Sequence, residues 1–222
     1  MTRHASPYLI PGFYETALSQ GKHRDIVGGR WEETALAQMD VLHKAGLQPH
    51  HRLLDIGCGC LRLGYMAVPY LNPGHYWGTD ASAGLMRRGW EVELTDADRS
   101  RLPLSQLIED ADFAFPDVPD DITHAIAWGV FTHLPAAPLR PALARLRQFP
   151  RLEMLLVTVF LVPEGHQGPL RQPDGVVTHP DRTPWHRPAA AVEADARAAG
   201  WQIDWPEARL PRGQRLARMQ PL

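Results

Sequence analysis

Cysteine is scarce in this chain of 222 residues, and an excess of charge of one sign and long apolar runs are both lacking. The two cysteines, Cys58 and Cys60, are separated by one residue, so a disulfide between them would be badly strained. They also fall short of the roughly four ligands of a structural zinc site. We therefore expect no disulfide framework and no metal site, but two reduced thiols in a cytoplasmic protein.

Membranes and nucleic acids are disfavoured as partners. No apolar run approaches the roughly 20 residues of a membrane span, and residues 1–6 lack the apolar core of a signal peptide. The formal net charge of −2 provides no overall attraction to nucleic acid or to an anionic membrane. The basic segment 209–218 offers no aromatic platform for bases, so we interpret it as a solvated hairpin at a sheet edge.

The residues that are present predict a single α/β domain, because strand and helix patterns alternate along the chain. We expect seven strands, at residues 52–56, 76–79, 107–110, 122–128, 154–161, 201–205 and 214–219. We expect helices at residues 8–20, 30–45, 61–71, 83–94, 138–148 and 189–199. This order predicts a mostly parallel sheet with helices on both faces. The last two strands follow each other without a helix, so one of them should pair antiparallel at the edge.

Two segments outside the regular pattern are expected to border a binding site. Residues 1–46 are predicted to form an N-terminal helical cap on a core at residues 47–222, with a flexible joint at 21–29. Segment 163–188 is rich in Pro, Gly and His, has no periodicity and is too long for a simple connection. We interpret it as a lid or binding loop. Segment 96–106 is charged and receives no assignment.

The most specific pattern is a glycine turn between the first strand and its helix. Gly57 and Gly59 stand where the backbone must turn sharply and approach a ligand closely. The N–H groups at the start of the following helix point back into this turn. Asp80 ends the second strand, where a carboxylate can accept both hydroxyls of a ribose. The order of these features predicts a cofactor that contains a nucleoside.

Two residues near the turn argue against a dinucleotide. The dinucleotide fingerprint has a third glycine at the position of Arg62. Asp55 stands just before the turn, where a carboxylate would repel a pyrophosphate but would tolerate a cationic amino group.

Residues 54–59, Leu-Asp-Ile-Gly-Cys-Gly, resemble motif I of the class I S-adenosylmethionine-dependent methyltransferases, and Asp80 matches their motif II acid. Segments 110–115 and 125–135 resemble the motif after the third strand and motif IV of the same family. The resemblance covers residues 30–161, with Cys60 and Leu61 departing from the usual third-glycine position. It implies a Rossmann-like fold, S-adenosylmethionine as cofactor and S-adenosylhomocysteine as product.

The resemblance also implies a set of cofactor-binding residues. They are Asp55, Gly57, Cys58 and Gly59 in motif I, Asp80 and Ala81 in motif II, Asp112 and Phe113 at the adenine, Trp128 of motif IV, and Trp31 of the cap. Asp112 is preferred as the acid for the adenine amino group, with Phe113 packing on the ring, and Asp110 is its competitor. Trp31 is alternatively an aromatic packed under the sheet.

Candidates for chemistry on the methyl acceptor are histidines. His133 follows the fourth strand and has an ordinary pKa near neutrality, so it is a candidate general base, although a loop-bonded histidine is equally compatible. His179, His186 and Asp181 in the long loop are candidates for the acceptor pocket, with chance placement as the alternative.

We therefore expect a methyltransferase that modifies an O or N atom of a small molecule or peptide, in specialised metabolism. Three alternatives remain at this stage: a methyltransferase acting on RNA or protein, a non-catalytic S-adenosylmethionine-binding partner protein, and a nicotinamide-dependent oxidoreductase. The last is disfavoured by Arg62 and Asp55. The sequence leaves open the acceptor, the need for a general base and the oligomeric state, a homodimer included.

Overall fold

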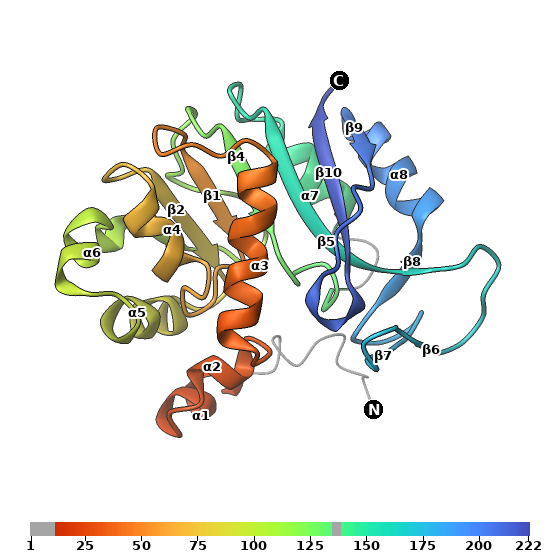
Figure 1. Ribbon diagram of the computed structural model, residues 1–222, viewed down its shortest axis with the longest axis horizontal. Coiled ribbons are helices and arrows are strands. Elements are labelled where there is room, and N and C mark those ends of the chain that lie inside the picture. Colours follow the sequence, from red (N-terminus) through yellow and green to blue (C-terminus); the bar gives the residue numbers. More distant parts are fainter. Residues whose placement is uncertain (1–11, 135–138) are drawn as a thin grey trace.

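A mostly parallel sheet forms the centre of the computed structural model, which describes residues 12–134 and 139–222 (Figure 1). Its spatial order is β3-β2-β1-β4-β5-β10-β9. The strands are β1 (Leu53–Ile56), β2 (Tyr76–Asp80), β3 (Leu107–Glu109), β4 (His124–Ala127), β5 (Met154–Val162), β9 (Trp201–Asp204) and β10 (Arg215–Pro221). The seven expected strands are all present. The predicted fold class is confirmed.

The antiparallel strand lies one position in from the edge. β10 inserts between β5 and β9 and pairs antiparallel with both. β9 is the outermost strand on this side, although it precedes β10 in the chain. The insertion places the start of β10 beside the end of β5, because Arg215 pairs with Val159.

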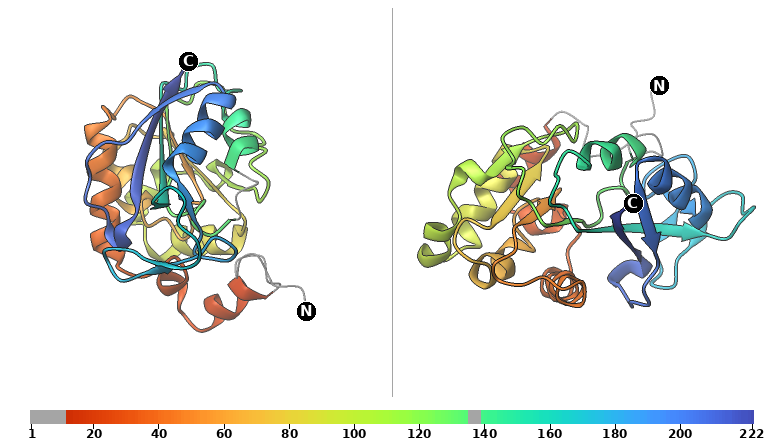
Figure 2. Two further views of the ribbon diagram at one scale, coloured as in Figure 1. Left: turned by 90° about the vertical axis from the view of Figure 1, so that its right-hand side faces the viewer. Right: turned by 90° about the horizontal axis from the view of Figure 1, so that it is seen from above.

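Helices cover both faces of the sheet (Figure 2). They are α1 (Phe13–Ser19), α2 (His23–Ile26), α3 (Trp31–Lys44), α4 (Gly64–Tyr70), α5 (Ala83–Val92), α6 (Asp96–Arg101), α7 (Leu139–Leu146) and α8 (Ala189–Ala198). Leu42 of α3 and Val68 of α4 belong to one buried apolar cluster, whereas Leu143 of α7 and Val192 of α8 belong to another. β1 and β4 lie between these layers and are buried along their whole length.

The long segment 163–188 is more ordered than its sequence predicts. It contains the hairpin strands β6 (Leu170–Arg171) and β7 (Val177–Thr178), and β8 (His186–Pro188), which pairs parallel with the end of β5. Strands of two or three residues are too short to produce a visible alternation of apolar and polar residues. The hairpin lies near the carboxyl ends of the parallel strands (Figure 1).

Two other segments also differ from expectation. Segment 96–106 contains α6 and the 3-10 helix η2 (Leu104–Gln106), and a capping box between Thr95 and Asp98 starts α6. The predicted joint at 21–29 contains the short helix α2. The predicted helix at 61–71 begins later, at Gly64, because the preceding residues extend the glycine turn.

The N-terminal helices α1 and α2 lie near the carboxyl ends of the parallel strands (Figure 1). α1 and α2 both contact α5, and the Arg24 guanidinium donates to Glu93 just after α5, with Nε to Oε1 at 2.8 Å. Parts of the predicted helices 8–20 and 138–148 lie outside the described residues. Of the helices within 12–134 and 139–222, none has the length and apolar character that a membrane crossing requires.

Candidate functional site

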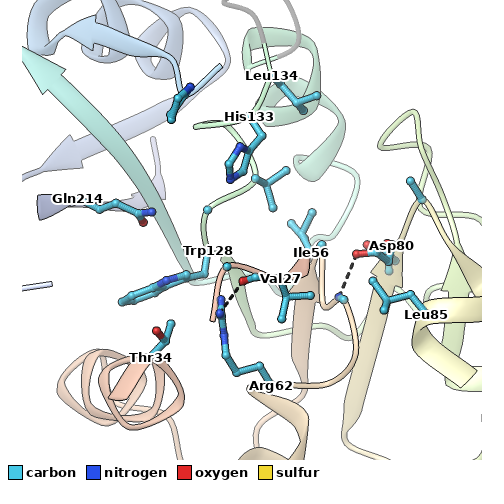
Figure 3. Close-up of a pocket in the computed structure, with 18 of the residues that line it drawn as sticks. Val27, Thr34, Ile56, Arg62, Asp80, Leu85, Trp128, His133, Leu134 and Gln214 are labelled. Carbon is cyan, nitrogen blue, oxygen red and sulfur yellow. Dashed lines mark hydrogen bonds between the residues drawn. The ribbon is translucent and has the colours of Figure 1, made fainter. Parts of the chain in front are cut away.

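A pocket opens at the carboxyl ends of β1, β2 and β4 (Figure 3). β1 lies between β2 and β4, so the chain leaves the centre of the sheet in opposite directions at this point. Open α/β sheets bind ligands at such a switch in strand order. Asp80 and Leu85 lie on one side of the pocket, and Trp128 and Gln214 lie on the opposite side (Figure 3).

The glycine turn forms the floor of this pocket. Gly57 and Gly59 have φ values of 69° and 57°, in the left-handed region that favours glycine. The N–H of Gly57 donates to the Thr79 carbonyl oxygen at 2.7 Å, which ties the turn to the end of β2. A Cβ atom on Gly57 would stand 2.5 Å from Cγ2 of Val130, and one on Gly59 would stand 2.7 Å from Cγ1 of Val27. The turn therefore has room for backbone only.

Asp80 places a half-buried carboxylate beside the turn. Its Oδ2 accepts the Gly59 N–H at 2.9 Å and its Oδ1 accepts the Ser82 N–H at 3.1 Å. Burial raises the pKa of Asp80 to about 6, against the opposing effect of these N–H donors. Each oxygen uses one lone pair for the backbone and keeps another for a ligand. Ala81, the next residue, also lines the pocket.

Of the two acids after β3, Asp110 reaches the pocket and Asp112 does not. The Asp110 carboxylate accepts the N–H groups of Asp112, Ala114 and Phe115 at 2.8–3.1 Å. These bonds hold a tight loop in which Phe113 has a φ of 57°. Phe113 lines the pocket and stacks on Phe131, with ring centroids 5.5 Å apart. The Asp112 side chain is exposed.

Three other expected cofactor residues lie outside the pocket lining. Asp55 is buried in β1 and accepts a hydrogen bond of 2.6 Å from the Tyr76 hydroxyl. Cys58 packs beside Gly78 of β2, where a Cβ on the glycine would be 2.8 Å from the sulfur. Trp31 stacks on Tyr65, with ring centroids 5.8 Å apart.

Both cysteines are free and buried. Burial raises the pKa of Cys60 to about 12 and raises that of Cys58 well above its ordinary value, so both thiols stay protonated. The Cys60 thiol donates to the His23 carbonyl at 3.2 Å. Within residues 12–134 and 139–222, no group of three His, Cys, Asp or Glu side chains is arranged to hold a metal ion.

Asp55 makes the stability of the protein depend on pH. Burial raises its pKa from an ordinary value near 4 to about 7, so the protonated form stabilises the fold and this contribution is lost as the pH rises through 7. Asn at this position is neutral at every pH. The free energy of unfolding of Asp55→Asn, relative to that of wild type, should therefore increase by about 2 kcal/mol between pH 5 and pH 8. Urea unfolding of both proteins at pH 5 and pH 8 measures this change. The same difference in free energy of unfolding between variant and wild type at both pH values would contradict the prediction.

His133 lines the pocket and belongs to the loop after β4. Its Nδ1 is 3.1 Å from the Thr183 hydroxyl oxygen. Burial and the nearby positive charge of Arg212 lower the pKa of His133 to about 4. The expectation of a pKa near neutrality is therefore wrong, because both causes come from the tertiary structure. His133 is a neutral hydrogen-bonding group at pH 7 and a weak base.

The other acceptor-site candidates of the long loop lie outside the pocket lining, namely His179, Asp181 and His186. The ring Nδ1 of His186 is 2.8 Å from the Thr178 hydroxyl, within the loop itself. The loop instead contributes Val176 and Pro184 to the pocket.

The pocket also has residues that sequence patterns did not indicate. Val27 and Gly28 cover the glycine turn, and Arg62 Nη1 donates to the Val27 carbonyl oxygen at 2.6 Å (Figure 3). Arg212 and Gln214 enter from the start of β10. The interpretation of 209–218 as a solvated hairpin is therefore wrong for these two residues, because β10 inserts next to β5. Trp128, as expected from motif IV, lies in the lining.

No family model matches the chain. Its fold is similar to that of magnesium protoporphyrin IX methyltransferase (ChlM) from Synechocystis PCC 6803 with bound SAH, at 14% identity and a TM-score of 0.64, over 94% of this chain and 96% of that one. It is also similar to Streptomyces venezuelae DesVI, at 18% identity and a TM-score of 0.60 over 91% and 98%. A SAM-dependent methyltransferase from Aquifex aeolicus has 16% identity and a TM-score of 0.56 over 83% and 89%. The chain therefore has a Rossmann-like fold that is similar to the folds of these three structures.

Proposed function

We propose that the chain is an S-adenosylmethionine-dependent methyltransferase that modifies an O or N atom of a small molecule. The observation that carries this proposal is the half-buried Asp80 carboxylate beside a turn with room for backbone only. Two adjacent ribose hydroxyls are the complementary donors for its two oxygens. The similarity to methyltransferase structures, one of them with bound SAH and another with bound SAM, supports the same cofactor.

The remaining lining residues fit the other parts of this cofactor. Asp110 offers an acceptor for the adenine amino group, and Phe113 offers an apolar face for the ring. On this basis we prefer Asp110 to Asp112 as the adenine-binding acid. Arg62 is the cation beside the glycine turn, and it is suited to the methionine carboxylate.

S-adenosylmethionine, when bound, supplies a methyl group on a positively charged sulfur, which is strongly electrophilic. The chain's own residues would position the acceptor and exclude water, and such orientation can provide most of the catalysis. Val27 and Gly28 cover the turn, and the Arg212 guanidinium donates to the Gly28 carbonyl oxygen and closes the cover. Neutral His133 is suited to accept a hydrogen bond from an O–H or N–H acceptor group.

A small acceptor is favoured over nucleic acid by the charge of the pocket. Among the described lining residues, Arg62 and Arg212 are the two that carry a positive charge, since His133 is neutral. A groove that follows a phosphate backbone needs many more cations. We extend the proposal to a specialised metabolite or a peptide as acceptor, in a cytoplasmic enzyme.

The test is transfer of label from S-adenosylmethionine with an isotopically labelled methyl group. The acceptors offered are small phenols, amines, aromatic acids and short peptides, and the product is identified by mass spectrometry. We expect a labelled product from at least one small molecule, and none from the Asp80→Ala variant. Normal binding of S-adenosylhomocysteine without transfer to any acceptor would instead favour the non-catalytic binding protein.

A further inference from the structure

Gln214 carries a buried side-chain oxygen to which no described residue donates a hydrogen bond. The residue precedes β10, is 6% exposed and lines the pocket above Trp128 (Figure 3). Its Oε1 accepts no hydrogen bond from any described residue. An unsatisfied buried polar atom costs about 1–3 kcal/mol, and each such atom in a native structure needs an explanation. A donor on a bound molecule is the explanation that fits an atom in a pocket.

Arg212, two residues earlier, lines the same pocket. It lies in the 3-10 helix η3 (Pro211–Gly213), with a φ of 65° that few residues other than glycine adopt. Its N–H donates to Asp174 Oδ2 at 2.7 Å, and its guanidinium donates to the Gly28 carbonyl oxygen. Backbone strain of this kind persists where the surrounding structure enforces it, and it concentrates at binding sites.

The positive charge of the Arg212 guanidinium is not paired with a carboxylate of any described residue. Among the described residues, no carboxylate forms an ion pair with it within 4 Å, and the Asp174 carboxylate is engaged by Arg30 at 2.5 Å. Arg212 lines the pocket together with His133, and its charge contributes to the lowered pKa of that histidine. A planar guanidinium pairs with a carboxylate through two parallel hydrogen bonds.

The walls around these two polar groups are apolar and partly aromatic. They include Trp128, Phe160, Val176 and Pro184. Gln214 also approaches Gly129, since its Nε2 would lie 4.0 Å from a Cβ on that glycine. This part of the pocket lies on the opposite side from Asp80 (Figure 3). It is therefore separate from the residues proposed to bind the ribose.

We propose that Arg212 and Gln214 form the acceptor subsite, and that the acceptor is a small planar acid. Its carboxylate pairs with Arg212, an O–H or N–H group donates to Gln214 Oε1, and its ring packs against the apolar walls. This inference rests on the proposed methyltransferase function, because it assigns the acceptor to the part of the pocket that the cofactor leaves open.

Binding of matched acids and amides tests the subsite without knowledge of the natural acceptor. The probes are benzoate, salicylate, 4-hydroxybenzoate and indole-2-carboxylate, each with its carboxamide, titrated into protein saturated with S-adenosylhomocysteine. We expect at least one acid to bind ten-fold or more tightly than its amide. Gln214→Leu should weaken the hydroxylated or N–H-bearing acids about five-fold or more and leave benzoate unchanged.

Arg212→Gln should remove the preference for acids over their carboxamides. Arg209→Gln is the matched control, because this exposed arginine lies outside the pocket and its loss changes the net charge equally. If no acid binds more tightly than its amide, or if Arg212→Gln keeps the preference, the subsite is overturned. If Arg212→Gln fails to fold, the comparison of acids with their carboxamides in the wild-type protein still tests the proposed subsite. Absence of S-adenosylhomocysteine binding would instead overturn the proposed function, and this inference with it.

Discussion

Asp80→Ala is expected to weaken the binding of S-adenosylhomocysteine by about 100-fold or more. The variant removes a half-buried carboxylate that is proposed to accept two ribose hydroxyls, and hydrogen bonds to a charged group contribute about 1.5–3 kcal/mol each. A loss of about 3 kcal/mol corresponds to a change of about 150-fold in Kd. Isothermal titration calorimetry of wild type and variant measures the ratio.

Glu109→Ala is the matched control for this experiment. Glu109 pairs with Asp80 across β2 and β3, but it is exposed and lies outside the pocket. Its removal deletes a carboxylate at the same register and should leave Kd within about two-fold of wild type. An Asp80→Ala variant that folds and binds as tightly as the control would refute the ribose assignment.

The pKa of Asp80 gives the same binding a predictable pH dependence. In the free protein this pKa is about 6, and the ionised form is the one proposed to accept both ribose hydroxyls. Affinity should therefore be constant above pH 7 and fall below pH 6, by up to about ten-fold per pH unit. Asp80→Asn should abolish this dependence, and a wild-type affinity that stays constant down to pH 5 would contradict the assignment.

Gly89→Ala is expected to destabilise the fold by about 3 kcal/mol. A Cβ on Gly89 would stand 2.3 Å from the Cys60 carbonyl oxygen and 2.4 Å from its carbonyl carbon. Both are backbone atoms, so the clash separates α5 from the glycine turn. Thermal unfolding should show a Tm lower by about 6–12 °C for a protein of this size.

Gly84→Ala is the control on the same helix. The nearest atom to a Cβ there is Leu18 Cδ1 at 3.4 Å, an ordinary contact, and alanine favours helix by up to about 1 kcal/mol. This variant should be as stable as wild type or slightly more so. Equal losses of stability in the two variants would contradict the proposed contact between α5 and the turn.

Sequence patterns were sufficient for the centre of the fold because its strands are apolar and almost entirely buried. The apolar residues of β1, β4 and β5, and the turn that follows β1, are visible without tertiary information. The strands of the segment 163–188 are too short to be predicted in this way. The contact of Gly89 with Cys60 joins a helix to a turn and has no sequence signature.

The contribution of Arg212 and Gln214 to the pocket could not be predicted, because it depends on how β10 is placed. Insertion of β10 between β5 and β9 brings Arg212 and Gln214 beside Trp128. In the sequence these two residues belong to a basic segment near the end of the chain. The low pKa of His133 has the same origin, since burial and Arg212 both act through the tertiary structure.

Titration of the wild-type protein with S-adenosylhomocysteine and with NADH tests the central claim most directly. We predict saturable one-to-one binding of S-adenosylhomocysteine and no measurable heat from NADH at the same concentrations. Arg62 occupies the position of the third glycine of a dinucleotide site, and Val27 covers Gly59. Binding of NADH without binding of S-adenosylhomocysteine would contradict the account.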